Sequence, residues 1–315
     1  MKWSRDGVQA ELGTVDWAFS QPASGLQWLQ YCAAYGLEFA EEGCSGHYAG
    51  LMDCAGYHIA VQVWKKPSAR GTALLVHGYY DHTGLYGSLI RFCLQQGLNV
   101  VAFDLPGHGL SSGEQASIGT FQEYDEVFSH LLQRVQQYLP GACYAFGQST
   151  GGAILINYLL KRQLTPQQCP FAGITLMAPL VRPLGWASGR IIHTFASLFV
   201  RRIRRKFKPN AANPEFLHFI ANKDPLQPRH LNVRWVSALK QWIPYIEAQP
   251  SSSVMVNIIQ GDGDHTVDWR HNLQILQDKF PNQRLLVLPG GQHHLVNESP
   301  EQRQRMYQQI ADWLF

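Results

Sequence analysis

A serine lies between glycines at residues 147–151, which read Gly-Gln-Ser-Thr-Gly. An apolar run at 142–146 precedes this motif, and a helix-length apolar segment at 153–160 follows it. A tight turn from a strand into a helix exposes a serine hydroxyl, and the helix N-terminus favours the negative charge that develops when the hydroxyl reacts. Small neighbours are needed because the turn is strained. A plain Gly/Ser turn would not need these flanking elements, so the pattern predicts that Ser149 is a nucleophile.

A serine nucleophile needs a base to take its proton and a carboxylate to orient that base. The loop after one apolar run holds Asp262 and Asp264, and the loop after the next holds His293 and His294. Serine, then acid, then histidine is the chain order of one known arrangement of such sites. Asp264 is favoured over Asp262, which lies early in its turn, whereas the choice between the two histidines stays open at this point.

The elements that must position these residues alternate along the chain. Apolar runs bounded by turn residues, typical of strands in a parallel sheet, occur at 73–76, 99–103, 142–146, 173–177, 254–260 and 284–288. Segments with helical periodicity occur at 86–96, 121–139, 153–160, 272–280 and 300–315. This alternation predicts a doubly wound α/β sheet, with the chemical residues in loops at one edge. Asp268 is expected to cap the helix that follows it, and His265 to face solvent.

The chain before the first parallel strand is predicted to be an extension followed by a hairpin. Residues 1–44 form the extension, irregular over 1–23 and with a short helix near 26–34. Residues 47–53 and 57–64 suit two strands, because Cys-Ala-Gly between them suits a turn.

The alternation breaks once, over residues 180–250, which are rich in Arg, Trp and Pro. This segment is predicted to be a cap over the carboxyl edge of the sheet, which leaves 45–179 and 251–315 as the core. Residues 180–234 carry eleven Lys and Arg against two acidic residues, whereas the rest of the chain is net acidic. The cap is therefore expected to have a surface role of its own.

An apolar stretch at 191–200 is followed by a basic run at 201–208. Together they predict an amphipathic helix with a cationic end. Two interpretations of the basic run stay open: attraction to an anionic membrane, at about 1 kcal/mol per basic residue, and a charge run that is merely solvated. The aromatic residues of the cap are expected mainly to pack, with a few lining an acyl pocket.

The composition excludes several classes of protein. Hydrophobic residues make up 45% of the 315 residues and charged residues 16%, against about a quarter on average, so a disordered chain or a charge-rich nucleic-acid binder is not expected. Six cysteines show no metal-ligand spacing and are expected to be reduced thiols, with Cys93 and Cys143 in the core. The N-terminus lacks a signal-peptide pattern, and no apolar stretch reaches about 18 residues. We therefore expect a cytoplasmic protein, at most peripheral to a membrane.

Three blocks together resemble the monoacylglycerol lipase and lysophospholipase branch of the α/β-hydrolases, also described as the serine aminopeptidase family. They are His-Gly-Tyr-Tyr-Asp-His at 77–82, Asp-Leu-Pro-Gly-His-Gly-Leu-Ser at 104–111 and the serine motif. The resemblance covers about 57–180 and 250–315. It implies an α/β-hydrolase fold with an inserted helical cap, and an enzyme that cleaves carboxylic esters of a lipid-like kind, such as a monoacylglycerol or a lysophospholipid. It implies neither a metal nor an organic cofactor.

The resemblance also assigns the acid and the base. The family's acid is the last residue of a Gly-x-x-Asp pattern, which falls on Asp264, and its base stands five residues before a glutamate, which makes it His293 before Glu298. The negative oxygen of the tetrahedral intermediate needs two backbone N–H donors. These are expected from Tyr79 and Thr150.

Other residues are expected to support the site without touching the substrate. His77 and Gly78 would shape the loop that carries Tyr79, and Asp81 and His82, at the position of the family's Glu-His pair, would brace it. Asp104 and His108 are read as structural residues of the second block.

Two residues depart from the family pattern: Gln148 before the serine, where histidine or another polar residue is usual, and Thr150 after it, where methionine or a similar apolar residue is common. Gln148 is read as a supporting residue. The cap has no useful resemblance, which leaves the substrate open. Two alternatives therefore remain: the same nucleophile in a peptidase, thioesterase or acyltransferase, and a non-catalytic binding protein on a hydrolase scaffold.

Overall fold

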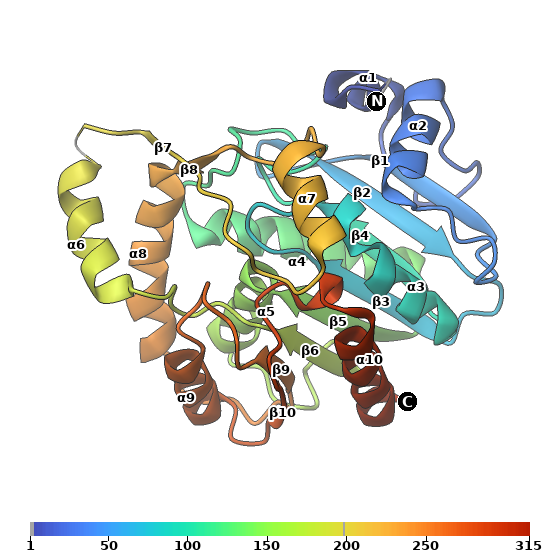
Figure 1. The fold of residues 1–315 in the computed structure, drawn as a ribbon. Helices are drawn as coiled ribbons and strands as arrows, with labels where there is room; N and C mark the ends of the chain where they lie inside the picture. The colour runs from blue at the N-terminus through green and yellow to red at the C-terminus, as the bar shows by residue number, and fades with distance from the viewer. Residues whose placement is uncertain (1–2, 198) are drawn as a thin grey trace.

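The computed structural model describes residues 3–197 and 199–315, in which helices flank a central twisted sheet (Figure 1). The sheet has eight strands in the order β1-β2-β4-β3-β5-β6-β9-β10. The six strands from β4 to β10 are parallel, and the β1–β2 hairpin joins them antiparallel at one edge. The strands are β1 (Gly46–Cys54), β2 (Tyr57–Lys65), β3 (Gly71–Val76), β4 (Asn99–Phe103), β5 (Ala142–Gln148), β6 (Gly173–Met177), β9 (Asn257–Gly261) and β10 (Arg284–Leu288).

Alternate side chains of the central strands enter two separate apolar layers, as the period of two in a strand requires. On β3, Leu74 and Val76 pack into one layer, and Ala73 and Leu75 pack into the other. The first layer includes residues of α4 (Phe121–Tyr138), α5 (Thr150–Lys161), α8 (Val233–Ala248) and α9 (Trp269–Lys279). The second includes residues of α2 (Leu26–Tyr35), α3 (Gly87–Gln95) and α10 (Pro300–Leu314). Burial on both faces explains why the strands read as continuous apolar runs.

The N-terminal extension contains one element that its sequence did not predict. Helix α1 (Arg5–Glu11) lies within residues expected to be irregular, and the Ser4 side chain caps it by accepting a hydrogen bond from the Gly7 N–H. A single helix residue, Val8, is buried, so a seven-residue helix shows too little periodicity to be detected. Gln9 donates a hydrogen bond to the Leu110 carbonyl, which fastens the extension to the loop after β4.

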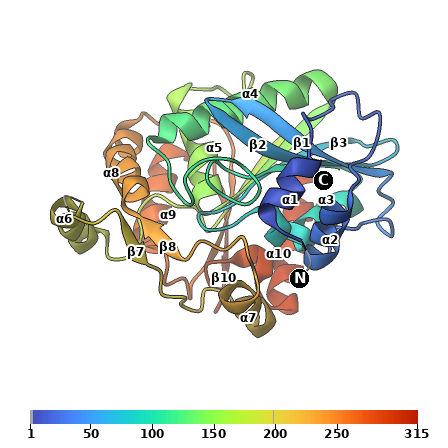
Figure 2. The ribbon, with the colours of Figure 1, turned by 90° about the horizontal axis from the view of Figure 1, so that it is seen from above.

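The segment between β6 and β9 forms α6 (Trp186–Ala196), β7 (Arg202–Arg204), α7 (Pro214–Asn222), β8 (His230–Asn232) and α8. Figure 2 shows α6 at the side of the molecule opposite α1 and α2. Helix α8 packs on the core, where Trp242 stacks on Phe121 at 4.6 Å between ring centroids and donates a hydrogen bond to Asn157. The cap boundaries of 180 and 250 stay a prediction.

The prediction that residues 191–208 form one helix with a cationic end is wrong. Helix α6 ends at Ala196, and the basic run continues as β7, which pairs antiparallel with β8 through Ile203 and Leu231. Like charges one helical turn apart repel each other, whereas an extended strand separates them. Among the described residues, no helix has both the length and the apolar character needed to cross a membrane.

Candidate active site

Ser149 stands on the sharp turn between β5 and α5, in a strained backbone conformation with a positive φ of 53° and a ψ of −113°. The two flanking glycines leave room for this turn. A Cβ on Gly151 would stand 2.0 Å from the Val76 carbonyl oxygen, and a Cβ on Gly147 would stand 2.7 Å from the Gly151 backbone. The strained serine therefore depends on both glycines, as the motif predicts.

Three side chains that are far apart in the sequence meet at this turn. The Ser149 Oγ lies 2.9 Å from Nε2 of His293, and Nδ1 of the same imidazole lies 2.7 Å from Oδ2 of Asp264. All three residues are buried. With Nδ1–H donating to the carboxylate, Nε2 is free to accept the serine proton, which is the tautomer that nucleophilic catalysis needs.

The Asp264 carboxylate is held by the loop after β9. Its Oδ1 accepts hydrogen bonds from the Thr266 and Val267 N–H groups at 2.7 and 3.1 Å, and its Oδ2 accepts one from Gln260 Nε2 at 3.1 Å. The alternative acid, Asp262, is exposed and instead accepts a hydrogen bond from the Gly290 N–H. The backbone donors leave Asp264 ionised and aimed at the histidine.

The loop after β10 is fixed from two sides. Gln148 donates to the His293 carbonyl at 2.8 Å, and buried Glu298 accepts from the Gln292 N–H at 2.7 Å. The alternative base, His294, contacts a different carboxylate, because its Nε2 lies 3.1 Å from Oδ1 of Asp81. In the loop after β9, Asp268 is the N-cap of α9, which confirms the prediction that it caps the following helix.

The charges within this chain of residues shift each other's pKa. Burial lowers the pKa of His293, the Asp264 carboxylate raises it, and the net pKa lies above the ordinary histidine value. Burial raises the pKa of Asp264, but the histidine and the two backbone donors lower it, and the net pKa lies below the ordinary value. The carboxylate therefore stabilises the imidazolium that forms when His293 takes a proton.

The loop after β3 carries Tyr79 to the edge of the same site. His77 makes a hydrogen bond from Nδ1 to the Gly78 carbonyl and accepts one from the Leu105 N–H, which fixes the loop to the chain after β4. A Cβ on Gly78 would stand 3.2 Å from the Ser149 Cβ, so glycine permits the close approach. Thr150 is the first residue of α5, where backbone N–H groups lack partners within the helix.

Asp81 and His82, predicted as a pair, have different partners. Asp81 accepts a hydrogen bond from the Tyr86 hydroxyl at 2.9 Å, and that hydroxyl accepts one from the Gly78 N–H, so Asp81 braces the loop. His82 lies 3.0 Å from Asp224 of the inserted segment, with both side chains wholly buried. Asp224 also accepts a hydrogen bond from Tyr35 of α2. This link between extension, core and insertion has no signal in the sequence.

The second motif block, residues 104–111, makes contacts that hold neighbouring loops in place. Asp104 accepts hydrogen bonds from the Thr83 and Leu110 N–H groups, both at 2.7 Å, and is fully buried. A Cβ on Gly109 would stand 2.1 Å from the Asp104 carboxylate, which explains the glycine. The His108 ring meets the Tyr79 ring edge to face, with 5.6 Å between ring centroids.

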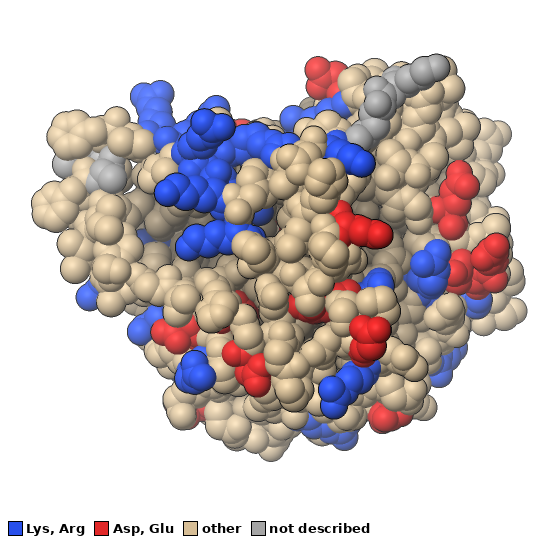
Figure 3. Space-filling view, in the orientation of Figure 1, with Lys and Arg blue, Asp and Glu red and all other residues tan. Residues whose placement is uncertain are grey.

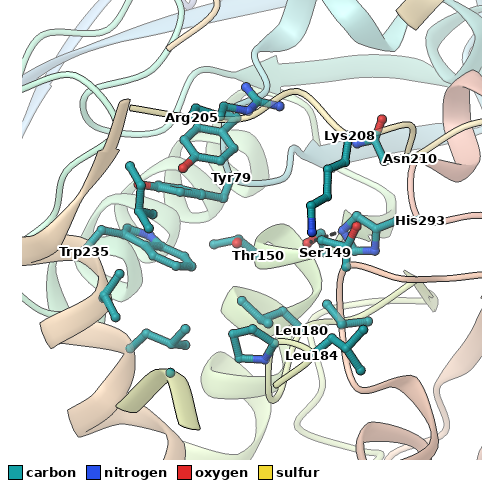
Figure 4. Close-up of a pocket in the computed structure, with 18 of the residues that line it drawn as sticks. Tyr79, Ser149, Thr150, Leu180, Leu184, Arg205, Lys208, Asn210, Trp235 and His293 are labelled. Carbon is teal, nitrogen blue, oxygen red and sulfur yellow. Dashed lines mark hydrogen bonds between the residues drawn. The ribbon is translucent and has the colours of Figure 1, made fainter. Parts of the chain in front are cut away.

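A cavity of about 530 Å³ opens over Ser149, Thr150 and His293 (Figure 4). The inserted segment supplies much of its wall, including Trp235 of α8, whose ring stacks on Tyr79 at 3.8 Å. Within the described residues, no group of three or more His, Cys, Asp or Glu side chains is arranged to hold a metal ion. The arrangement places a serine hydroxyl, an imidazole and a buried carboxylate beside a mainly apolar cavity.

Comparison with known proteins agrees with this geometry. The model of the family described as "Serine aminopeptidase, S33" matches residues 67–300. The chain is 32% identical to a monoacylglycerol lipase of Mycolicibacterium smegmatis, over 85% of this chain and 95% of that protein. It is 27% identical to human monoglyceride lipase, over 84% of this chain and 89% of that protein.

Among solved structures, a soluble variant of monoglyceride lipase from Saccharomyces cerevisiae superposes with a TM-score of 0.71, at 19% identity over 84% of this chain and 93% of that one. This likeness confirms the predicted fold class. The chain belongs to the serine aminopeptidase S33 family of α/β-hydrolases, in the branch that contains the monoglyceride lipases.

Proposed function

We propose that this protein, a carboxylic ester hydrolase, cleaves lipid-like esters through an acyl-enzyme formed on Ser149. The observation that carries the proposal is the continuous chain of contacts from Ser149 through His293 to Asp264, at 2.9 and 2.7 Å. A non-catalytic scaffold would not need a strained serine, an oriented imidazole and a buried carboxylate in one line.

The reaction follows from the roles of these groups. His293 Nε2 takes the Ser149 proton as Oγ bonds to the ester carbonyl carbon; the bond from that carbon to the alcohol oxygen then breaks, and the imidazolium gives its proton to the departing oxygen. A water molecule next attacks the acyl-enzyme, giving one proton to His293. The bond to Ser149 breaks, the serine regains its proton, and the carboxylic acid leaves. One water is consumed for each ester.

The backbone N–H groups of Tyr79 and Thr150 serve as donors to the negative oxygen of the two tetrahedral intermediates. Both residues border the cavity beside Ser149. The loss of one such donor costs about 3 kcal/mol of transition-state stabilisation. Because Tyr79 is clamped between Trp235 and the Ala116 carbonyl, which accepts from its hydroxyl at 2.8 Å, its backbone is held in place before substrate binds.

A single acyl chain is the substrate portion that suits the cavity. Its walls include Leu180, Val267 and Leu239, and its volume of about 530 Å³ lies within the range of small-molecule sites. Monoglyceride lipases are among the relatives, which supports esters of this kind.

Replacement of Ser149 by alanine tests the nucleophile. S149A is expected to lower the hydrolysis of short p-nitrophenyl esters by about 10⁶-fold, because the base then has no hydroxyl to activate. Replacement of exposed Ser253 by alanine is the matched control, and circular dichroism checks that both variants fold. Retained activity in folded S149A refutes the proposal. Comparison of ester, thioester and aminoacyl-arylamide substrates tests the reaction class, and faster cleavage of either of the last two would make the protein a thioesterase or a peptidase.

We also propose that the protein contacts anionic membranes through α6 and the adjacent basic run. Ile192, Phe195 and Phe199 are 66, 68 and 87% exposed, which is unusual for a group of large apolar side chains. Figure 3 shows Lys and Arg side chains gathered beside this apolar projection, over the β7 region. Apolar side chains enter the lipid while cations meet the headgroups, which gives the enzyme access to esters in a bilayer.

Sedimentation with phosphatidylglycerol vesicles tests this contact. F195S is expected to lower the bound fraction, whereas L26S, which removes an equally exposed apolar side chain (66%) on α2, is expected to leave it unchanged. Equal losses from both variants, or no binding by the wild type, would contradict the proposed surface.

A further inference from the structure

The cavity over Ser149 has two chemically different sides. Leu180 and Leu184 lie on one side of the serine in Figure 4, and the Lys208 side chain extends toward the serine from the other. Arg204 and Lys206, from the same stretch of chain as Lys208, also line the cavity. An apolar wall and a cationic wall therefore flank the bond that would be cleaved.

The cationic wall has no acidic partner of its own. Among the described residues, no carboxylate lies within ion-pair distance of Arg204, Lys206 or Lys208, whereas the neighbouring Arg202, outside the cavity, pairs with Glu114 at 2.8 Å. Asp81, an acidic residue of the lining, already contacts His294 and Tyr86. The three cations are thus available to a ligand.

The backbone that carries these cations is anchored. Arg205 donates a hydrogen bond to Gln227 at 2.7 Å, and its guanidinium stacks on Tyr80 at 4.0 Å from the ring centroid. The Arg205 N–H also donates to the Arg229 carbonyl at 2.9 Å. A charge run that was merely solvated would not need this fastening to the wall of the cavity.

We infer that Lys208, with Arg204 and Lys206, forms a subsite for a phosphate monoester on the alcohol portion of the ester, so that acylglycerol phosphates are preferred over neutral glycerides. This inference rests on the proposed function, because it names the substrate of the same site. The acyl chain takes the apolar side, and the alcohol, which leaves first, takes the cationic side. A phosphate monoester carries more than one negative charge at neutral pH and has several acceptor oxygens, which suits three cations better than a neutral hydroxyl does.

Two esters that differ only at this group test the inference: 1-hexanoylglycerol and 1-hexanoylglycerol 3-phosphate. Both are used as monomers in solution, without vesicles, so that membrane binding has no influence. The wild type is expected to have a kcat/KM at least about tenfold higher for the phosphorylated ester, which is the scale of one charge-assisted hydrogen bond. This preference is expected to shrink as salt is added, because the three cations are exposed to solvent.

The variant K208M is expected to lower the ratio of the two kcat/KM values by about tenfold, mainly through the KM of the phosphorylated ester. K223M is the matched control. It removes the same charge from an exposed residue of the same inserted segment, outside the cavity lining, and is expected to keep the wild-type ratio.

The outcomes separate the subsite from the proposed function. If the wild type cleaves neither ester nor p-nitrophenyl esters, the proposed function itself fails. If it cleaves both glycerol esters with equal kcat/KM, or if K208M and K223M change the ratio equally, the subsite is refuted while the esterase stands. Equal inhibition of both substrates by free glycerol 3-phosphate, without preference for the phosphorylated ester, would indicate a site for a separate small anion and would also overturn the inference.

Discussion

Replacement of Asp264 by asparagine removes one charge at nearly constant shape. In the wild type, Oδ1 accepts from two backbone N–H groups, while Oδ2 accepts from Gln260 and faces Nδ1 of His293. The asparagine oxygen is expected to keep the two backbone donors, which places its NH₂ group against His293. The imidazole must then accept at Nδ1 and carry its proton on Nε2, where it can no longer take the proton of Ser149.

The expected loss in kcat is about 10⁴-fold, equivalent to about 5.5 kcal/mol, as for a wrong histidine tautomer in other serine hydrolases. A second effect is separate from this loss. Because Asp264 raises the pKa of His293 whereas burial lowers it, D264N is expected to move the acidic limb of the residual activity to lower pH.

Initial rates with p-nitrophenyl butyrate from pH 5 to 9 measure both the loss in kcat and the shift of the acidic limb. D262N serves as the control, because Asp262 is exposed and its carboxylate contacts the Gly290 N–H rather than the imidazole. D262N is expected to stay within about twofold of the wild type, as is usual for surface substitutions. The assignment of the acid would be refuted if folded D264N lost less than tenfold of its activity, or if D262N lost more activity than D264N.

The pKa of His293, the turn at Gly151 and the His82–Asp224 pair can each be tested separately. In the wild type, activity is expected to fall as the pH drops through a midpoint above about 6.5, because His293 must be neutral to act and its pKa is raised; a midpoint well below this value in a kcat/KM profile would contradict the coupling to Asp264. G151A is expected to lower the free energy of unfolding by at least about 1–3 kcal/mol, because its Cβ would meet backbone at 2.0 Å; an unchanged urea midpoint would show that the turn can relax. D224N is expected to lower the free energy of unfolding by about 3–5 kcal/mol, because it leaves the buried His82 imidazolium without a negative charge beside it. The pKa of His82 is raised, so its contribution to stability is lost as the pH rises through that pKa; the pKa of Asp224 is lowered, so its contribution is lost at low pH. Urea unfolding should therefore show the largest difference in stability between D224N and the wild type between about pH 4 and 6.5. A difference that does not depend on pH would argue against a charged pair.

Most of the core could be predicted because each strand is buried on both faces and each helix on one. The runs that became β3, β4 and β5 are apolar throughout, and α4 shows helical periodicity over its whole length. The sequence does not predict helix α1, because a single buried residue, Val8, shows no helical periodicity of apolar residues. The basic run was misread because pairing with β8, a contact across about 28 residues of sequence, decides its conformation, and local propensity does not report such contacts.

The candidate site could be located because its residues lie in motifs with fixed spacing. The structure brings Ser149, His293 and Asp264 together, and Gln148 donates to the carbonyl of His293. His77, Gly78 and Asp81 instead fix the loop that carries Tyr79. Gln260 and Asp224 were not foreseen, since a lone amide and a lone carboxylate carry no pattern. Lys208 lay within a recognised basic run, but its place beside the serine depends on the path of the chain after β7.

Reaction with a fluorophosphonate probe, followed by mass spectrometry of the digested protein, examines the proposed nucleophile without any assumption about the substrate. A single adduct is expected on the peptide that contains Ser149, absent from S149A and formed much more slowly in D264N, because only a serine beside an oriented imidazole attacks phosphorus at a useful rate. Full esterase activity in protein that carries no adduct at Ser149, or whose adduct maps to another residue, would contradict a mechanism in which this hydroxyl forms the acyl-enzyme.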